Sequence, residues 1–187
     1  NQREERHIWA VDAAGGTPVR LSSGGFSANP TWSPDGRRFA YLRSTATEPP
    51  ELVVQASEPS AAPVRLTESQ PQPPIGSAFV EPEAVSYPSS GGVQVPAVLL
   101  RPRGPAGSSR PAIMYFHGKG GINLLGWGGL SHYAFHQLLV QQGYAVLFVN
   151  WRGTHVGYGA EFERANYRDY AGGELDDVKA GAEFLTR

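Results

Sequence analysis

Two polar, glycine-bearing turns follow short apolar runs, and they are the parts of this sequence best suited to chemistry. The run 112–116 ends in His117-Gly118-Lys119-Gly120-Gly121, and the run 144–149 ends in Asn150-Trp151-Arg152-Gly153. Each run is too short for a lone helix and stops abruptly, as a buried parallel strand does where it meets a functional loop. Open α/β sheets bind ligands at the carboxyl ends of their strands. We therefore expect both turns at the ligand-binding edge of a sheet.

Arg152 follows the second run directly, and two roles are open for it. Either its guanidinium contacts a substrate at the sheet edge, or its planar fork of donors braces the loop. The sequence favours neither role. Asp176 and Asp177 are not expected to form a catalytic pair, because adjacent helix residues do not face each other. Acids in a first helical turn are in any case stabilised by the helix dipole.

No metal site or cofactor is expected. His132 and His136 are spaced i, i+4, but Tyr133 stands where a glutamate would complete His-Glu-x-x-His. We expect both histidines to pack against the sheet.

Helical periodicity begins at Ser131, a plausible N-cap, and Gly143 suits the position just past the helix end. A second helix is expected over 174–185. Four residues of the first helix share one face: Phe135, Leu138, Leu139 and Gln142. In the second helix one stripe should pack on the sheet, and it consists of Leu175, Val178, Ala182 and Leu185.

The strands should form a mixed, mostly parallel sheet with flanking helices. Residues 84–87 and 93–101 predict an antiparallel pair joined through the Ser89–Gly92 turn. The strand-helix-strand-helix order that follows predicts parallel strands linked by right-handed crossovers.

Residues 1 to about 70 predict an all-β segment with an internal repeat. Pro-Val-Arg-Leu begins at Pro18 and again at Pro63, 45 residues later, each time after a short β-type run. This period is typical of a four-stranded propeller blade. Between the copies, Ser33-Pro34-Asp35-Gly36 predicts a hairpin turn after Trp32, with Phe39 and Tyr41 on one face of the next strand.

Prolines at 71, 73, 74 and 82 predict a connector, so we divide the chain into 1–75 and 76–187. Sixteen basic and 17 acidic residues, without a run of either sign, indicate neither nucleic acid nor membrane as a partner. No cysteine is present, which excludes disulfides and a cysteine nucleophile. The compartment, cytoplasmic or periplasmic and secreted, stays open, as does the oligomeric state.

Taken in order, four motifs resemble the prolyl oligopeptidase family of serine peptidases. They are the Trp-Ser-Pro-Asp-Gly repeat motif, the His117-Gly118-x-Gly120-Gly121 turn, Asn150-x-Arg152-Gly153 with Gly157-Tyr158-Gly159, and the segment 172–178. The resemblance implies that 1–75 holds the last blades of a β-propeller and that 76–187 is the first part of an α/β-hydrolase domain.

In this family a serine, an aspartate and a histidine form the catalytic triad, and the resemblance places all three after Arg187. No Gly-x-Ser-x-Gly elbow occurs in the chain; Gly129-Leu130-Ser131-His132 begins like one, but Tyr133 replaces the second glycine. No catalytic residue is therefore expected here. The resemblance implies that the turn His117-Gly118-Lys119 supplies one oxyanion donor. The Lys119 ammonium could stabilise the oxyanion, hold a substrate carboxylate or face solvent.

The leading hypothesis is a part of a serine peptidase that hydrolyses peptide or acyl-peptide bonds and is inactive without the rest of its protein. An esterase-type α/β-hydrolase and a non-catalytic propeller scaffold are the alternatives.

Overall fold

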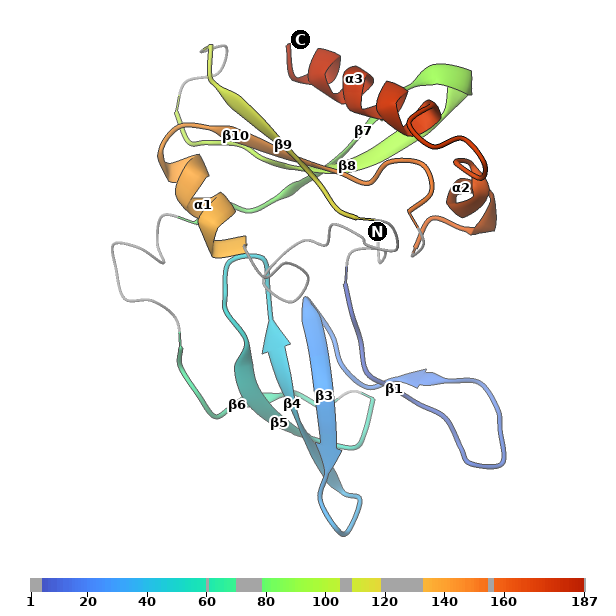
Figure 1. Cartoon of the computed structure of the whole chain (residues 1–187). Helices are drawn as coiled ribbons and strands as arrows, with labels where there is room; N and C mark the ends of the chain where they lie inside the picture. The colour runs from blue at the N-terminus through green and yellow to red at the C-terminus, as the bar shows by residue number, and fades with distance from the viewer. Residues whose placement is uncertain are drawn as a thin grey trace. The chain divides into compact units, whose positions relative to one another are not determined.

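The computed structural model describes residues 5–59, 61–69, 79–104, 109–118, 133–154 and 157–186. The chain divides into two compact units (Figure 1). The first comprises Asn1–Ala78 with Leu125–Ser131, and the second comprises Phe79–Leu124 with His132–Arg187.

The first unit consists of β-strands in the described residues. A two-stranded sheet, β1-β2, precedes a four-stranded antiparallel sheet in the order β3-β4-β5-β6. The strands are β1 Trp9–Ala10, β2 Val19–Arg20, β3 Phe26–Trp32, β4 Arg38–Ser44, β5 Glu51–Ala56 and β6 Val64–Arg65.

The predicted hairpin turn is confirmed. Trp32 in β3 pairs with Phe39 in β4. The Gly36 amide donates to the Ser33 carbonyl at 2.9 Å, and Gly36 has a φ of 69°, which a glycine adopts without strain. The Ser33 hydroxyl donates to the Asp35 carboxylate at 2.7 Å. Asp35 is thus held as a turn corner.

The two sequence copies adopt the same strand register. Trp9 pairs with Arg20 in the first copy, as Val53 pairs with Arg65 in the second. The hydrogen bond from the Leu21 amide to the Ile8 carbonyl, at 2.9 Å, recurs from Leu66 to Leu52 at 2.8 Å. In each copy, a hydroxyl that follows the second strand also accepts from a backbone amide near the start of the first strand. Ser22 accepts from the Ile8 amide at 2.8 Å, and Thr67 accepts from the Leu52 amide at 2.9 Å. The repeat is therefore a repeat of structure.

The core of the first unit joins the two sheets. Phe39 and Tyr41 share the buried face of β4, as predicted, and their rings stack at 5.2 Å between centroids. Ile8 and Leu21, which flank the β1-β2 pair, pack with them and with Val53.

The second unit contains a four-stranded sheet in the order β7-β8-β10-β9. Its strands are β7 Glu83–Pro88, β8 Gln94–Leu100, β9 Ala112–Phe116 and β10 Ala145–Val149, and a short 3₁₀ turn, η3 Ser90–Gly92, joins β7 to β8. The predicted antiparallel pair at its start is confirmed. The expectation of a mostly parallel sheet is wrong for the described strands, because β8 also pairs antiparallel with β10 and only β9 and β10 run parallel. That β8-β10 pairing is long-range, and no local pattern specifies its direction.

Helices α1 Tyr133–Gln141 and α3 Gly173–Leu185 pack on opposite faces of this sheet (Figure 1). His136 in α1 lies against the ring of Phe148, whereas Phe184 in α3 belongs to the cluster around Leu147 and Val149. Successive strand residues point to opposite faces, so the two helices are on different sides. A short helix, α2 Ala160–Arg164, lies between β10 and α3.

The predicted helix faces match the buried faces only in part. In α1, Phe135 and Leu138 are 57% and 49% exposed, and the buried side chains are Tyr133, His136, Gln137 and Val140. In α3, Leu175 and Ala182 are exposed, whereas Val178 is half-buried and Leu185 packs against the core cluster, as predicted. The fully buried residues of α3 are Gly173, Asp177 and Gly181. Both buried stripes hold polar or small residues, which an apolar periodicity does not detect. Among the described helices, none is long and apolar enough to cross a membrane.

Candidate functional site

The two turns singled out in the sequence begin side by side. Phe116, the last residue of β9, pairs with Val149, the last residue of β10, in the parallel register. The chain therefore leaves both strands at the same edge of the sheet. The prediction that the turns share this edge is confirmed for the residues that the structure describes there.

His117, directly after β9, is held by the segment that follows β10. Its ring stacks on the indole of Trp151, with 5.5 Å between centroids and 19° between planes. The Thr154 hydroxyl lies 3.2 Å from Nε2, and the Trp151 indole N–H donates to the His117 carbonyl at 3.4 Å. Nδ1 lies 2.8 Å from the Gly118 carbonyl. A carbonyl only accepts, so these partners place the proton on Nδ1.

Burial lowers the pKa of His117, against the opposing effect of its hydrogen bonds to the Gly118 carbonyl and the Asn150 side chain. The neutral ring is therefore the form present at neutral pH. In that form Nε2 is an acceptor, whereas the single proton of the Thr154 hydroxyl is donated to the Trp151 carbonyl, 2.7 Å away.

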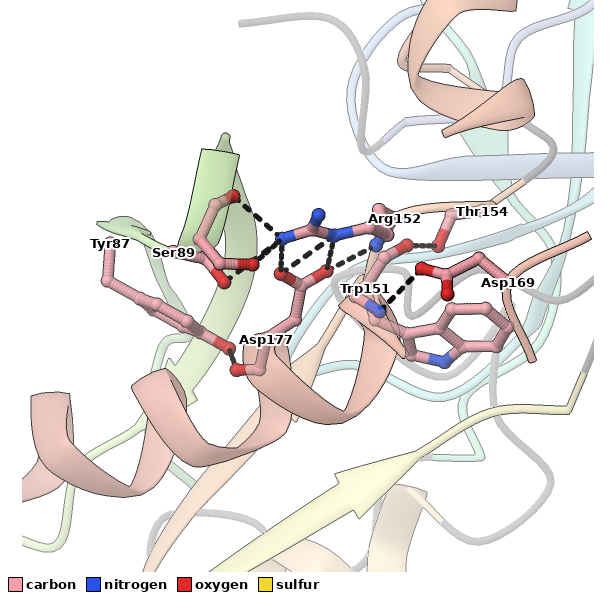
Figure 2. A network of polar contacts seen from close by, with 9 residues as sticks. Tyr87, Ser89, Trp151, Arg152, Thr154, Asp169 and Asp177 are labelled. Atoms are coloured by element: carbon pink, nitrogen blue, oxygen red, sulfur yellow. Dashed lines mark hydrogen bonds and ion pairs between the residues drawn. The ribbon is translucent and has the colours of Figure 1, made fainter. Parts of the chain in front are cut away.

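Arg152 forms a buried ion pair with Asp177 of α3 (Figure 2). The Asp177 carboxylate accepts from Nη2 at 2.7 Å, from Nε at 3.1 Å and from the Arg152 backbone amide at 2.8 Å. Nη2 also donates to the Ser89 hydroxyl and to the Ser90 carbonyl, between β7 and β8. The Asp177 carboxylate raises the pKa of Arg152, so the guanidinium stays charged.

These contacts are those of the bracing role. The Arg152 side chain is 9% exposed and Asp177 is 0% exposed, and the guanidinium joins the loop after β10 to α3 and to the β7-β8 turn. These contacts do not test the other predicted role of Arg152, which is contact with a substrate.

Asp177 is a residue that sequence reasoning missed. A place near the start of a helix is sufficient to explain an acid, yet the Asp177 carboxylate anchors the loop that follows β10. A signal was present: Gly173, Asp177 and Gly181 are spaced i, i+4, i+8, which puts one acid between two small residues on a single helix stripe.

Further hydrogen bonds join the described residues between β10 and α3. Asn150 donates to the Tyr158 hydroxyl at 2.9 Å. The Asp169 carboxylate accepts from the Gly173 amide at 2.8 Å (Figure 2). Glu174 accepts from Asn166 at 3.1 Å and from the Ala171 amide at 2.9 Å. Hydrogen bonds thus hold the described residues near both ends of this segment.

Several predicted residues lie outside the described part of the chain. They are Lys119, Gly120, Gly121, Ser131 and His132. Gly118 is described and exposed. His136 packs edge-on against Tyr115 at 4.8 Å between ring centroids, as expected for a core histidine. In the described ranges no group of three or more histidines and acids is placed to hold a metal.

Comparisons with known proteins agree with this arrangement. Residues 131–187 match the prolyl oligopeptidase family. The chain is 40% identical over 100 residues to the uncharacterized peptidase YuxL of Bacillus subtilis, covering 52% of this chain and 14% of that protein. It is 30% identical over 175 residues to the acylamino-acid-releasing enzyme of Homo sapiens, covering 86% of this chain and 22% of that protein.

Solved structures show the same fold. A puromycin-hydrolyzing peptidase of Mycobacterium tuberculosis superposes with a TM-score of 0.76 at 19% identity, over 98% of this chain and 28% of that one. The Pyrococcus horikoshii acylaminoacyl peptidase gives 0.74 at 21% identity, over 98% and 28%. The chain belongs to the prolyl oligopeptidase family. It spans 14% to 22% of the length of the curated relatives that it matches.

Proposed function

We propose that this chain is part of a serine-type peptidase that hydrolyses peptide or acyl-peptide bonds. The observation that carries the proposal is the fixed turn His117-Gly118 at the end of β9, held by the loop after β10, in a chain of the prolyl oligopeptidase family. The human relative is named an acylamino-acid-releasing enzyme, which supports acyl-peptides as the substrate class.

In this proposal residues 1–75 belong to a β-propeller. The four-stranded antiparallel meander β3-β4-β5-β6 has the strand order of a blade, and β1-β2 repeats the register of β5-β6. Ile8 and Leu21 of the first copy are buried against the next sheet, whereas the equivalent Leu52 and Leu66 are 37% and 56% exposed. That difference in exposure is expected when consecutive blades pack against each other, so that each blade buries the apolar residues of its neighbour.

Residues 76–187 form the first part of an α/β-hydrolase domain in the same proposal. An antiparallel hairpin, followed by two parallel strands joined through α1, supports this assignment. The catalytic serine, aspartate and histidine lie after Arg187. His117-Gly118-Lys119 provides a backbone donor for the oxyanion, and peptides are the substrates.

The test uses the full-length protein. A fluorophosphonate probe should phosphonylate one serine, with loss of fluoride, and N-acetyl-aminoacyl p-nitroanilides should be hydrolysed. Turnover of p-nitrophenyl esters without any amide hydrolysis would favour the esterase alternative. Absence of both labelling and turnover would refute catalysis and favour the scaffold. The 187-residue chain alone should give no labelling at any serine, including Ser131.

A further inference from the structure

The chain enters the second unit through two buried residues that belong to no strand. Phe79 and Val80 are 6% and 8% exposed, and they precede β7, which begins at Glu83. A buried backbone N–H or C=O that lacks a hydrogen bond is costly. Because these two residues lie outside the sheet, their backbone groups need other partners.

The side-chain amide of Gln137, in α1, provides both partners for Val80. Its Oε1 accepts from the Val80 N–H at 3.0 Å, and its Nε2 donates to the Val80 carbonyl at 2.9 Å. A residue of an adjacent antiparallel strand would exchange the same two bonds with Val80. The Arg103 guanidinium donates to the Phe79 carbonyl at 3.1 Å, so side chains hold two successive residues of the entering chain.

The Gln137 amide serves Val80 in one orientation only. A flipped amide would set its NH₂ against the Val80 N–H and its oxygen against the Val80 carbonyl. Nε2 also donates to the Tyr133 hydroxyl at 3.1 Å, and burial raises the pKa of Tyr133 to about 12, so this hydroxyl stays neutral. Tyr133, one helical turn before Gln137, therefore supports the orientation that Val80 requires.

We propose that Gln137 is an entry clamp, whose amide takes the place of a neighbouring strand and fixes the chain where it enters the second unit. The clamp joins Val80 to a helix residue 57 positions later, so the entering chain and α1 keep one relative position. It requires an amide, because a carboxylate of the same length offers no donor at neutral pH. The inference goes beyond the proposed function and does not depend on catalysis.

Hydrogen exchange of the full-length protein tests the clamp at the Val80 amide. Gln137→Met keeps the length of the side chain and removes both bonds to Val80, so this amide should exchange about tenfold faster or more. Gln141→Met is the matched control, because it makes the same change at an exposed position of α1. It should leave the exchange of Val80 unchanged.

Gln137→Glu separates hydrogen bonding from the filling of space. An ionised carboxylate accepts from the Val80 N–H but repels the Val80 carbonyl, whereas a protonated carboxyl accepts with one oxygen and donates with the other. The charged neighbours are Arg103, at the Phe79 carbonyl, and Glu81, whose charge acts on Tyr133. Because burial raises the pKa of a carboxyl, protection of Val80 relative to the wild type should be nearly normal at about pH 5 and about tenfold lower at about pH 9.

Wild-type protection of Val80 in Gln137→Met would overturn the inference. So would a loss in Gln137→Glu that is the same at both pH values, because the side chain would then act only by its size. The comparison of pH values holds even where Gln137→Met does not fold, and a Gln137→Glu variant that is unfolded at the lower pH would contradict the clamp. None of these measurements uses activity, so an inactive wild type would refute the proposed function alone.

Discussion

The buried ion pair makes a quantitative prediction for Asp177→Ala. The carboxylate is 0% exposed and accepts from the side chain and the backbone of Arg152. Its removal leaves a guanidinium that is 9% exposed, whose Nη2 still donates to the Ser89 hydroxyl and the Ser90 carbonyl. Breaking a buried pair by removing one partner typically costs 3–5 kcal/mol. Because Ser89 and Ser90 still hydrogen-bond the guanidinium, we expect Asp177→Ala to lower the free energy of unfolding by about 3 kcal/mol, the lower end of this range.

Hydrogen exchange of the full-length protein measures this change locally. Peptides that cover 150–154 and 173–186 should lose protection on the order of a hundredfold, which corresponds to about 3 kcal/mol. Peptides from β3 to β6 should not change. Asp176→Ala is the matched control: it removes the same group from the next helix position, which is only partly buried, and should cost at most about 1 kcal/mol from the helix dipole.

A double variant separates burial of charge from packing. Arg152→Met with Asp177→Leu removes both charges, so it should be more stable than Asp177→Ala alone. Equal losses for Asp177→Ala and Asp176→Ala, both below about 1 kcal/mol, would refute the reasoning that the ion pair anchors the loop.

Two further predictions concern other parts of the chain. A Cβ at Gly181 would lie 2.6 Å from both the Tyr87 hydroxyl and Met114 Cε, so Gly181→Ala should destabilise the full-length protein by about 1–3 kcal/mol, despite the better helix propensity of alanine. The control Glu183→Ala, at an exposed position of α3, should change the stability by less than about 0.5 kcal/mol. A stabilising effect of Gly181→Ala would contradict this packing. Hydrogen bonds, with that from Thr67 the most important, lower the pKa of Glu51 below 4.5 in the folded protein. The stabilising contribution of Glu51 is therefore present above pH 4.5 and is lost as the pH falls through the lower pKa of the folded state. Glu51→Gln should flatten the acid side of a plot of melting temperature against pH, and an unchanged acid side would show that Glu51 does not contribute.

Local features of the first unit were predictable from the sequence. The turn Ser33–Gly36 specifies its hairpin through residues that contact one another within four positions. The repeated Pro-Val-Arg-Leu sequence predicted equivalent structures, and the register is the same in both copies. Such signals depend on short-range geometry, which is written in neighbouring residues.

The buried helix faces were not predictable in this way, because they depend on distant partners. Gln137 is 0% exposed, and its amide bonds both the backbone N–H and the carbonyl of Val80, 57 residues earlier. A pattern of apolar spacing places glutamine outside and Phe135 inside, which is the reverse of what is observed. A buried polar side chain is stable only when its partner is present, and the sequence of the helix alone does not contain that partner.

The stripe of α3 that faces the sheet links stability to the candidate site. Cβ atoms at Gly173 and Gly181 would meet the Arg152 guanidinium and the Tyr87 hydroxyl, so these glycines allow the helix to approach closely. The close approach of α3 lets the Asp177 carboxylate accept from the Arg152 backbone amide. It also lets the Asp177 backbone carbonyl accept from the Tyr87 hydroxyl at 3.1 Å. Any side chain that moved α3 away would lengthen both contacts together. The position of the loop after β10, and of the His117 turn that it holds, is therefore set by two residues that have no side chain.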